Sequence, residues 1–401
     1  MRNNNKLAPV LALLLLSAQP ARAQLLDTLL PPAIPGYGQK FSVIAQHRQF
    51  SPGATGWNFG SITAAPSLNA AAGYDSAPGG ASASSVLQAN PSLLLTDDAA
   101  GFGLYTEGNF AAYPQNHAQN TNTGLVAAGE SITLPRETIT ISAAALHSAV
   151  TGFAFDTAAI TSPIPFTLLD LRASDKITAG LFTLTPDISL SRYTFAGVAS
   201  TANRTQQREA GTLAYTPGGP LTALLRLSAT QMNYDDPSQT ADIYQALIGL
   251  QEQQNALWTL SFLAGTAQRQ PHHGSNLTTP VIEARADWQP TMLDKISLTA
   301  SREIDDPDAI SATPYTGTSI KLAISHEYLE NVTFRTFAQL ANAQYIHSNL
   351  HEFLGTGELD MQWQATPALA VEVVYRFNTR QANALSAANE HVVTLGLTWT
   401  P

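Results

Sequence analysis

Apolar and polar side chains alternate along the last part of the chain with a period of two. Between residues 369 and 377 every second side chain is apolar, and the positions between them include Glu372 and Arg376. Residues 393–399 repeat the alternation and end at Trp399. A period of two predicts β-strands whose two faces meet different surroundings. The charged face excludes strands that are buried on both sides.

The aromatic residue close to the C-terminus is typical of the last strand of an outer-membrane barrel. In such a barrel, the apolar face of each strand contacts lipid and the polar face lines the lumen. The same alternation occurs at residues 282–289 and 358–364. We therefore predict that the apolar positions face the membrane and that the polar positions face a lumen.

Strand-like segments separated by turn signals follow one another along residues 63–401, at roughly 10–20-residue spacing. Tight connections alternate with longer polar ones, and the last long connection is expected at 382–387. This parity requires residues 163–185 to form one strand through Asp175-Lys176, before a tight turn at Pro186-Asp187. The predicted fold is an all-β, transmembrane, antiparallel up-and-down β-barrel of about eighteen strands, with sixteen as the alternative, short periplasmic turns and longer extracellular loops.

The first residues have the pattern of a secretory signal peptide, predicted at 1–23. Basic Arg2 and Lys6 precede an apolar stretch at 7–16, and a small-residue cleavage site follows. The apolar stretch is too short to cross a bilayer as a helix. Residues 24–62 are rich in Pro and Gly with little alternation, so we interpret them as either a periplasmic leader or a partial plug.

The composition is consistent with a membrane-embedded barrel. Only 12% of the residues are charged, the formal net charge is −10, and there is no cysteine. Soluble domains carry about a quarter charged residues, whereas half of each barrel strand faces lipid and needs none. No later stretch is apolar for long enough to span as a helix, and a closed barrel is then the remaining way to cross a membrane. The expected location is the bacterial outer membrane.

The sequence contains no recognisable catalytic, cofactor or metal site. His272-His273 lack further ligands at metal-site spacing, and an acidic group at Asp305, Asp306 and Asp308 is more typical of a solvated loop than of a cation site shared with lipopolysaccharide. There is no nucleophile elbow, no phosphate-binding loop and no basic cluster for nucleic acid. We therefore predict no enzyme activity, no cofactor and no nucleic-acid partner.

Charged residues of both signs occupy the polar phase of the predicted strands and are candidates to line the lumen. They suit either a wet channel or ion pairs that only stabilise the wall, and both interpretations are open. Tyr105 and Phe337 share this phase. The candidates are Glu107, Asp170, Arg172, Arg226, Glu283, Arg285, Asp287, Lys295, Arg335, Glu358, Asp360, Glu372 and Arg376.

The third external loop, expected at 148–162, is the longest and is unusually apolar. Exposed apolar patches are uncommon, so Phe153 and Phe155 predict that this loop folds inward and narrows the lumen. Asp156 would then project into the opening and, with Glu107, favour cations. The alternative is that the loop packs against neighbouring loops or a partner chain outside the lumen.

Several short motifs resemble those of a known family, putative beta-barrel porin 2. They are Asn58-Phe59-Gly60, Pro66-Ser67-Leu68 and Gly73-Tyr74-Asp75, and the stretches at 283–306, 323–345, 359–381 and 391–401 also resemble that family. The resemblance implies an outer-membrane barrel in a family often associated with envelope polysaccharide. It carries no catalytic or binding residue that can be transferred to this chain.

Two functions follow from these patterns. The first is a porin-like pore for small hydrophilic solutes. The second is an accessory barrel for export or anchoring of an extracellular polysaccharide, working with periplasmic export proteins. The expected surroundings are outer-membrane lipid and lipopolysaccharide, with polysaccharide or periplasmic proteins as further partners.

Overall fold

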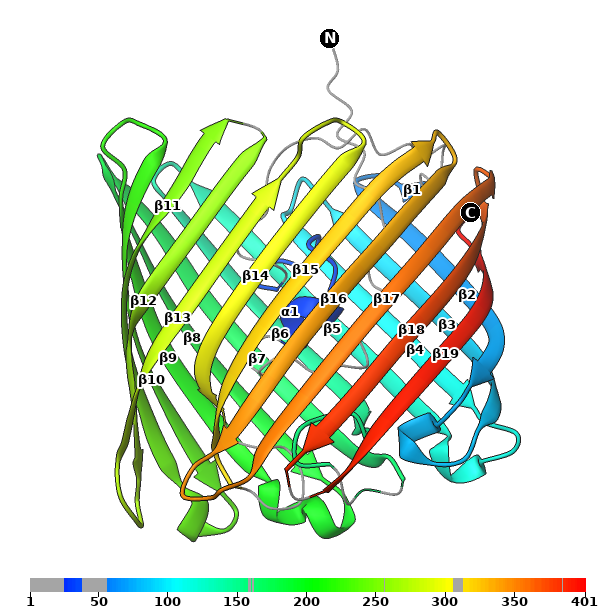
Figure 1. Ribbon diagram of the computed structural model, residues 1–401. Helices are drawn as coiled ribbons and strands as arrows, with labels where there is room; N and C mark the ends of the chain where they lie inside the picture. Colours follow the sequence, from blue (N-terminus) through cyan, green and yellow to red (C-terminus); the bar gives the residue numbers. More distant parts are fainter. Residues whose placement is uncertain are drawn as a thin grey trace.

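The computed structural model describes residues 25–37, 56–157, 160, 162–255, 257–305, 313–383 and 385–401. Nineteen strands form one sheet, and all except the three-residue β1 (Trp57–Phe59) make up the wall of a closed barrel (Figure 1). The wall therefore has eighteen strands, in agreement with the predicted fold. β1 pairs only with β2, in a short hairpin.

The wall strands follow one another in chain order, and each pairs antiparallel with its neighbours. They are β2 (Ile62–Asp75), β3 (Ser84–Asp97), β4 (Phe102–Ala112), β5 (Thr121–Leu134), β6 (Glu137–Val150), β7 (Ile164–Ala179), β8 (Phe182–Phe195), β9 (Arg204–Tyr215), β10 (Leu221–Tyr234), β11 (Ala241–Asn255), β12 (Trp258–Pro271), β13 (Leu277–Trp288), β14 (Asp294–Asp305), β15 (Tyr315–Leu329), β16 (Val332–Tyr345), β17 (His351–Thr366), β18 (Leu369–Ala382) and β19 (Leu385–Trp399).

Pairing between the first and last wall strands closes the barrel. The register runs from Trp399 opposite Leu68 to Val392 opposite Asp75. Closure leaves no unpaired sheet edge, so the backbone hydrogen-bonding groups of the wall are satisfied within the wall. Short helices lie in the outer loops at η2 (Pro78–Gly80), η3 (His117–Gln119), η4 (Gly197–Ala202) and η5 (Pro237–Gln239). No described helix has the length and apolar character needed to span a bilayer.

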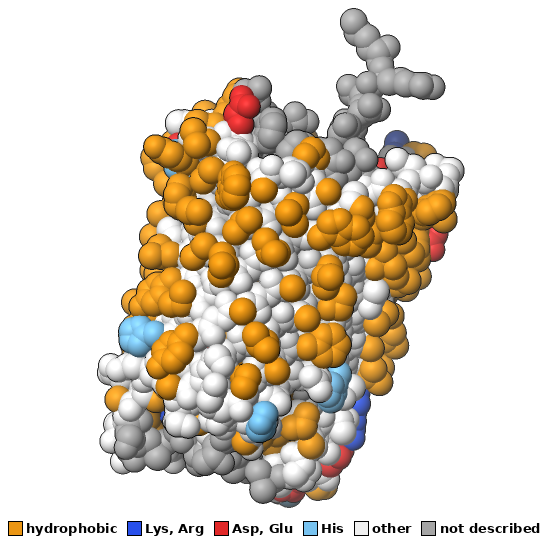
Figure 2. Space-filling view, turned by 90° about the vertical axis from the view of Figure 1, so that its right-hand side faces the viewer, with side chains coloured by type: hydrophobic (Ala, Val, Ile, Leu, Met, Phe, Trp, Pro, Cys, Tyr) orange, Lys and Arg blue, Asp and Glu red, His pale blue; other side chains and the backbone are white. Residues whose placement is uncertain are grey.

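The outer surface of the barrel is apolar, as the alternation predicts. Leu395 and Leu397 are 58% and 52% exposed, whereas Thr398 between the lipid-facing positions is buried. Exposed aromatic rings stack near the short turns, with centroids 5.0 Å apart both for Trp258 and Trp288 and for Phe182 with Tyr215. Hydrophobic side chains cover the wall in Figure 2, while acidic and basic ones lie near its two ends. This surface suits a lipid bilayer with an aromatic belt at its boundary.

The prediction of one strand over 163–185 is wrong, although Asp175-Lys176 does lie within a strand. β7 ends at Ala179, and the chain turns at Gly180, whose φ of +62° favours glycine. Pro186 and Asp187, expected in a turn, lie inside β8 opposite Gly211 and Ala210. Because proline has no N–H to donate, it interrupts the ladder with β7 without ending the strand. The parity of tight and long connections is preserved by the turn at Gly180.

The prediction of a long connection at 382–387 is also wrong. β18 continues to Ala382 and β19 begins at Leu385, so only residues 383 and 384 separate them. Polar and small residues continue the ladder there, as in the pairs Thr379–Asn389 and Arg380–Ala388. The third outer connection, residues 151–163, is the longest between the wall strands.

Residues 25–37 lie inside the barrel. The short helix α1 (Leu25–Leu29) is seen through the wall in Figure 1. Leu25, Leu26 and Ile34 are almost completely buried and belong to a cluster with inner-face residues of β3–β8. Burial of apolar surface against the wall holds this segment in place. The predicted signal peptide, and residues 38–55 of the predicted leader, lie outside the described residues.

Candidate functional site

The interior of the barrel has an apolar half and a charged half. On β3–β8, inner-face residues such as Leu125 and Phe166 pack with residues 25–37 in one cluster. On β13–β18, the inner face carries arginine and carboxylate side chains in ion pairs. We call residues 25–37 the internal segment and residues 151–163 the third outer loop.

Ionic and hydrogen-bonding contacts fix the internal segment to β7. Arg172 Nη1 lies 2.7 Å from Asp27 Oδ1, and Arg172 Nε lies 2.8 Å from Asp170 Oδ1. The Tyr37 hydroxyl donates to Asp170 Oδ1 at 2.9 Å, and Ser191 Oγ donates to the other carboxylate oxygen at 2.6 Å. Burial and the adjacent Asp170 carboxylate raise the pKa of Tyr37, which keeps its hydroxyl a donor. Asp170 and Arg172 therefore anchor the segment rather than line a free passage.

Two glycines on the inner wall make room for the internal segment. A Cβ at Gly129 would lie 2.3 Å from the carbonyl oxygen of Pro35, and one at Gly103 would lie 2.6 Å from that of Ala33. Real side chains do not approach backbone oxygens this closely. The wall and the segment are thus complementary in shape as well as in charge.

The third outer loop reaches from β6 and β7 to inner-face residues of β15, β17 and β18. The backbone N–H of Asp156 donates to Glu352 Oε2 at 2.8 Å, and the Tyr345 hydroxyl donates to the same oxygen at 2.9 Å. Arg380 donates to the carbonyl oxygen of Gly152. The ring centroids of Phe155 and Tyr315 lie 5.3 Å apart. Because β17 and β18 stand across the barrel from β6 and β7, the loop passes over the interior.

The first outer connection, residues 76–83, supports the third outer loop. A Cβ at Gly152 would lie 2.3 Å from the carbonyl oxygen of Gly79, so the two backbones are in direct contact. The N–H of Gly79 donates to Glu390 Oε1 at 3.1 Å, and Asn378 donates to the other oxygen of that carboxylate at 2.6 Å. Two loops and the inner faces of β18 and β19 therefore form one packed unit.

All thirteen charged residues predicted from the polar phase lie on the inner face, and the structure brings most of them into pairs. Neighbouring or nearby strands contribute the two partners, except where both come from one strand. The N···O distances are 2.6 Å for Arg226 with Glu283, 2.5 Å for Arg285 with Asp287, 3.5 Å for Arg335 with Asp360 and 2.7 Å for Arg376 with Glu358.

The remaining predicted residues have other surroundings. Glu107 accepts a hydrogen bond from the Tyr105 hydroxyl at 2.8 Å, and Tyr105 is buried in the apolar half. Glu372 accepts from Asn69 at 3.4 Å. No ion pair of Lys295 occurs with the described part of the chain. Glu107 and Asp156 contact different parts of the interior, so the two are not paired in one constriction.

Several inner-face residues that form the loop and wall contacts are not among those predicted from the sequence. They are Glu352, Arg380 and Tyr345 at the third outer loop, Arg208, which lies 3.2 Å from Asp187, and Lys321, whose Nζ lies 4.7 Å from the ring centroid of Phe337. All occupy the polar phase of their strands, so the same alternation could have identified them. Their partners could not be read from it.

Among the described residues, no group of three or more His, Asp and Glu side chains could hold a metal ion. His272 Nε2 lies 3.8 Å from Asp242 Oδ2 at the outer surface. Asp306 and Asp308 of the acidic group lie outside the described residues, and Asp305 is the last residue of β14.

Solved outer-membrane channels share the architecture of this barrel. OpdK from Pseudomonas aeruginosa, solved with vanillate, is 9% identical with a TM-score of 0.50, over 84% of this chain and 99% of that one. OccK2 (OpdF) from the same organism is 13% identical with a TM-score of 0.47, over 84% and 98%. At such low identity these likenesses show the fold alone. No curated protein sequence matches the chain.

A family match covers the C-terminal third of the chain. Residues 264–400 match the family described as Putative beta-barrel porin 2, which is the family that the sequence motifs resembled. The stretch includes β13–β19, with most of the charged inner face. A porin family and an eighteen-stranded lipid-facing barrel place the protein in the bacterial outer membrane. By residues 264–400, the chain belongs to the Putative beta-barrel porin 2 family, a family of channel barrels rather than of enzymes.

Proposed function

We propose that the barrel is a pore through which small hydrophilic solutes cross the outer membrane. The observation that carries this proposal is the strip of paired charges on the inner face of β13–β18, opposite the internal segment. It extends from Arg285 and Asp287 near the short turns to Glu352 near the outer rim. The internal segment covers the apolar half, so the passage follows this strip.

Paired charges suit passage better than tight capture. Each guanidinium in the strip already has a carboxylate partner, as Arg376 has Glu358 at 2.7 Å. A hydrated solute can exchange hydrogen bonds with such a pair at little cost, without meeting an uncompensated charge that would hold it. Conduction requires sites weak enough for the solute to leave.

The internal segment and the third outer loop restrict the solute to a small size. Both enter the interior from the wall, the first at mid-height on β7 and the second near the outer ends of β17 and β18. In this proposal Phe153, Phe155 and Asp156 belong to the constriction. A cation preference would come from Asp156, because Glu107 is held by Tyr105 in the apolar half.

Swelling of proteoliposomes in isosmotic sugars tests the proposal. Purified full-length protein should admit a pentose faster than a hexose, and a hexose faster than a trisaccharide. Folded insertion is verified by the heat-dependent mobility of the barrel in electrophoresis. An absence of swelling in every sugar, from folded wild-type protein and from a variant lacking 152–160, would contradict a pore. Export of polysaccharide, the alternative suggested by the family resemblance, has no separate support among the described residues.

A further inference from the structure

The barrel wall divides into two layers between the outer ends of β13 and β14. Pairing between these strands stops at Ile282 opposite Arg302. Beyond that point, residues 277–281 pair only with β12, and residues 303–305 pair only with β15. The two strands therefore separate toward the outer rim, and each remains paired on its other side.

The outer end of β14 then passes over the inner face of the neighbouring strands. Ile304 belongs to a buried cluster with Leu263 of β12 and Val281 of β13, which lie on the lumen-facing side of those strands. Leu277 and Ile346 pack against the same cluster. Side chains on the face of β14 that carries Arg302 and Ile304 thus point into the space between the two layers.

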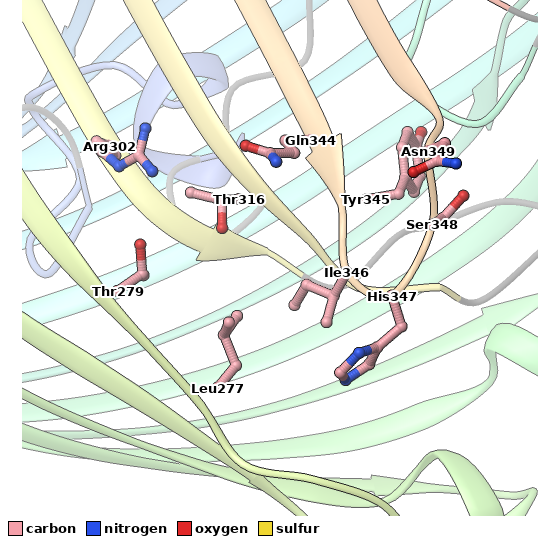
Figure 3. A pocket seen from close by; sticks show the side chains of 10 residues that line it. All are labelled: Leu277, Thr279, Arg302, Thr316, Gln344, Tyr345, Ile346, His347, Ser348 and Asn349. Carbon is pink, nitrogen blue, oxygen red and sulfur yellow. The ribbon is translucent and has the colours of Figure 1, made fainter.

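A cleft of about 470 Å³ lies in this space. In Figure 3, Leu277 and Thr279 of β13 lie on one side, and Arg302, Thr316 and Gln344 come from three successive strands on the other. The connection after β16 closes the cleft. Its lining residues are Leu277, Thr279, Arg302, Thr316, Gln344, Tyr345, Ile346, His347, Ser348 and Asn349.

Arg302 is the only ionised side chain at neutral pH among these lining residues, and no carboxylate lies with it. Its Nη1 donates to Thr318 Oγ1 at 3.2 Å, while its Nε is buried without a hydrogen-bond partner. The nearest candidates for a counter-charge are engaged elsewhere. Glu283 lies 2.6 Å from Arg226, and Asp305 lies against Gly317 on the lumen face.

A guanidinium held over an apolar cluster without a counter-charge is costly, and an anion supplied by a ligand removes the cost. Guanidinium groups bind phosphate and carboxylate through paired hydrogen bonds. Around Arg302, the hydroxyls of Thr279 and Thr316 and the amide of Gln344 offer both donors and acceptors. These groups match the hydroxyls of a sugar.

We propose that this cleft binds an anionic saccharide, a sugar that carries a phosphate or carboxylate group, with Arg302 on the anionic group. The position near the outer rim gives two sources of this chemistry: a free sugar phosphate, or the phosphorylated sugars of lipopolysaccharide in the outer leaflet. The site is separate from the proposed pore, because it lies between two layers of the wall and its test measures binding rather than flux.

Calorimetric titration of refolded, lipopolysaccharide-free protein in detergent tests the proposal, with glucose 6-phosphate, glucose and purified lipopolysaccharide as three probes. Glucose 6-phosphate should bind the wild type, and glucose should not. Arg302→Gln should weaken binding of the anionic probe about ten- to hundredfold. Arg192→Gln is the matched control, because Arg192 is paired with Asp235 at 2.9 Å on another outer loop, and it should bind like the wild type.

The two anionic probes distinguish the sources. Binding of glucose 6-phosphate alone identifies a free solute, while tighter binding of lipopolysaccharide that Arg302→Gln also weakens identifies the lipid. Gln344→Ala, also expected to weaken binding, replaces Arg302→Gln if the latter does not refold. The proposal is overturned if neither anion binds the wild type, if glucose binds as well as its phosphate, or if the folded cleft variant binds like Arg192→Gln.

Discussion

The guanidinium of Arg172 on β7 lies 2.7 Å from the carboxylate of Asp27 in the internal segment. The two residues are 145 positions apart in the sequence. The same guanidinium reaches Asp170 on its own strand, which in turn accepts from Tyr37. A charge that the strand pattern assigns to the lumen wall therefore joins the wall to a segment inside the barrel. The internal segment and the passage beside it are linked by this one side chain.

Replacement of Arg172 by Ala should loosen the internal segment. Asp27 and Asp170 would lose their common partner and would repel each other inside the barrel, where leaving a charge unpaired is costly. We expect a higher or more variable single-channel conductance in planar bilayers than for the wild type. Arg192→Ala removes an exposed ion pair at the outer rim and should leave conductance unchanged. Equal conductance of Arg172→Ala and the wild type would argue against an anchoring role.

Gly129→Ala should displace the internal segment without changing any charge. The added methyl group would collide with the Pro35 carbonyl oxygen, which lies only 2.3 Å from the position that a Cβ would take at this residue. We expect the direction of the conductance change to be that of Arg172→Ala. Gly211→Ala is the matched control, because no atom lies within 4 Å of a Cβ at that position. If both alanine variants conduct alike, the segment does not obstruct the passage.

The fold could be predicted because each strand records its surroundings in its own sequence. The alternation at 393–399 fixes which face meets lipid, and Leu397 is exposed while Thr398 is buried, as expected. The predicted turn between β7 and β8 is misplaced because Pro186-Asp187 is a strong turn signal. Gly180 supplies the turn instead, and the proline is accommodated in the strand with an interrupted ladder.

The interior could be predicted only in part. The polar phase identifies which charges face inward, but a pair such as Arg226 and Glu283 joins β10 to β13 across two intervening strands. Such a contact depends on the local curvature of the wall, which no strand records alone. The internal segment left a signal in its apolar residues, including Leu25, Leu26 and Ile34. Their location inside the barrel depends on a complementary wall more than a hundred residues away.

Substitutions on the two faces of β18 and β19 should differ sharply in cost. Val373→Arg or Leu397→Arg places a charge on the lipid face, where it should cost roughly 2–4 kcal/mol near the bilayer midplane. Val374→Ser and Thr398→Ser change buried inner-face residues and should be milder. Thr398 accepts a hydrogen bond from Asn69 at 2.8 Å, which serine preserves. Unfolding by denaturant in lipid vesicles measures the difference, and similar costs on both faces would contradict the membrane assignment.

Deletion of residues 152–160 should widen the passage. The deleted stretch includes Asp156, whose N–H reaches Glu352, and the carbonyl of Gly152, which accepts from Arg380. Without it, the third outer loop can no longer cross to β17 and β18, and single-channel conductance should rise clearly.

Tyr345→Phe provides a graded control for the loop deletion. It removes the hydroxyl donor to Glu352 but leaves the loop backbone in place, so its conductance should stay closer to that of the wild type. Phe155 and Tyr315, whose rings lie 5.3 Å apart, still hold the loop in that variant. Wild-type conductance in a deletion variant with the heat-dependent mobility of a folded barrel would mean that the loop does not narrow the pore.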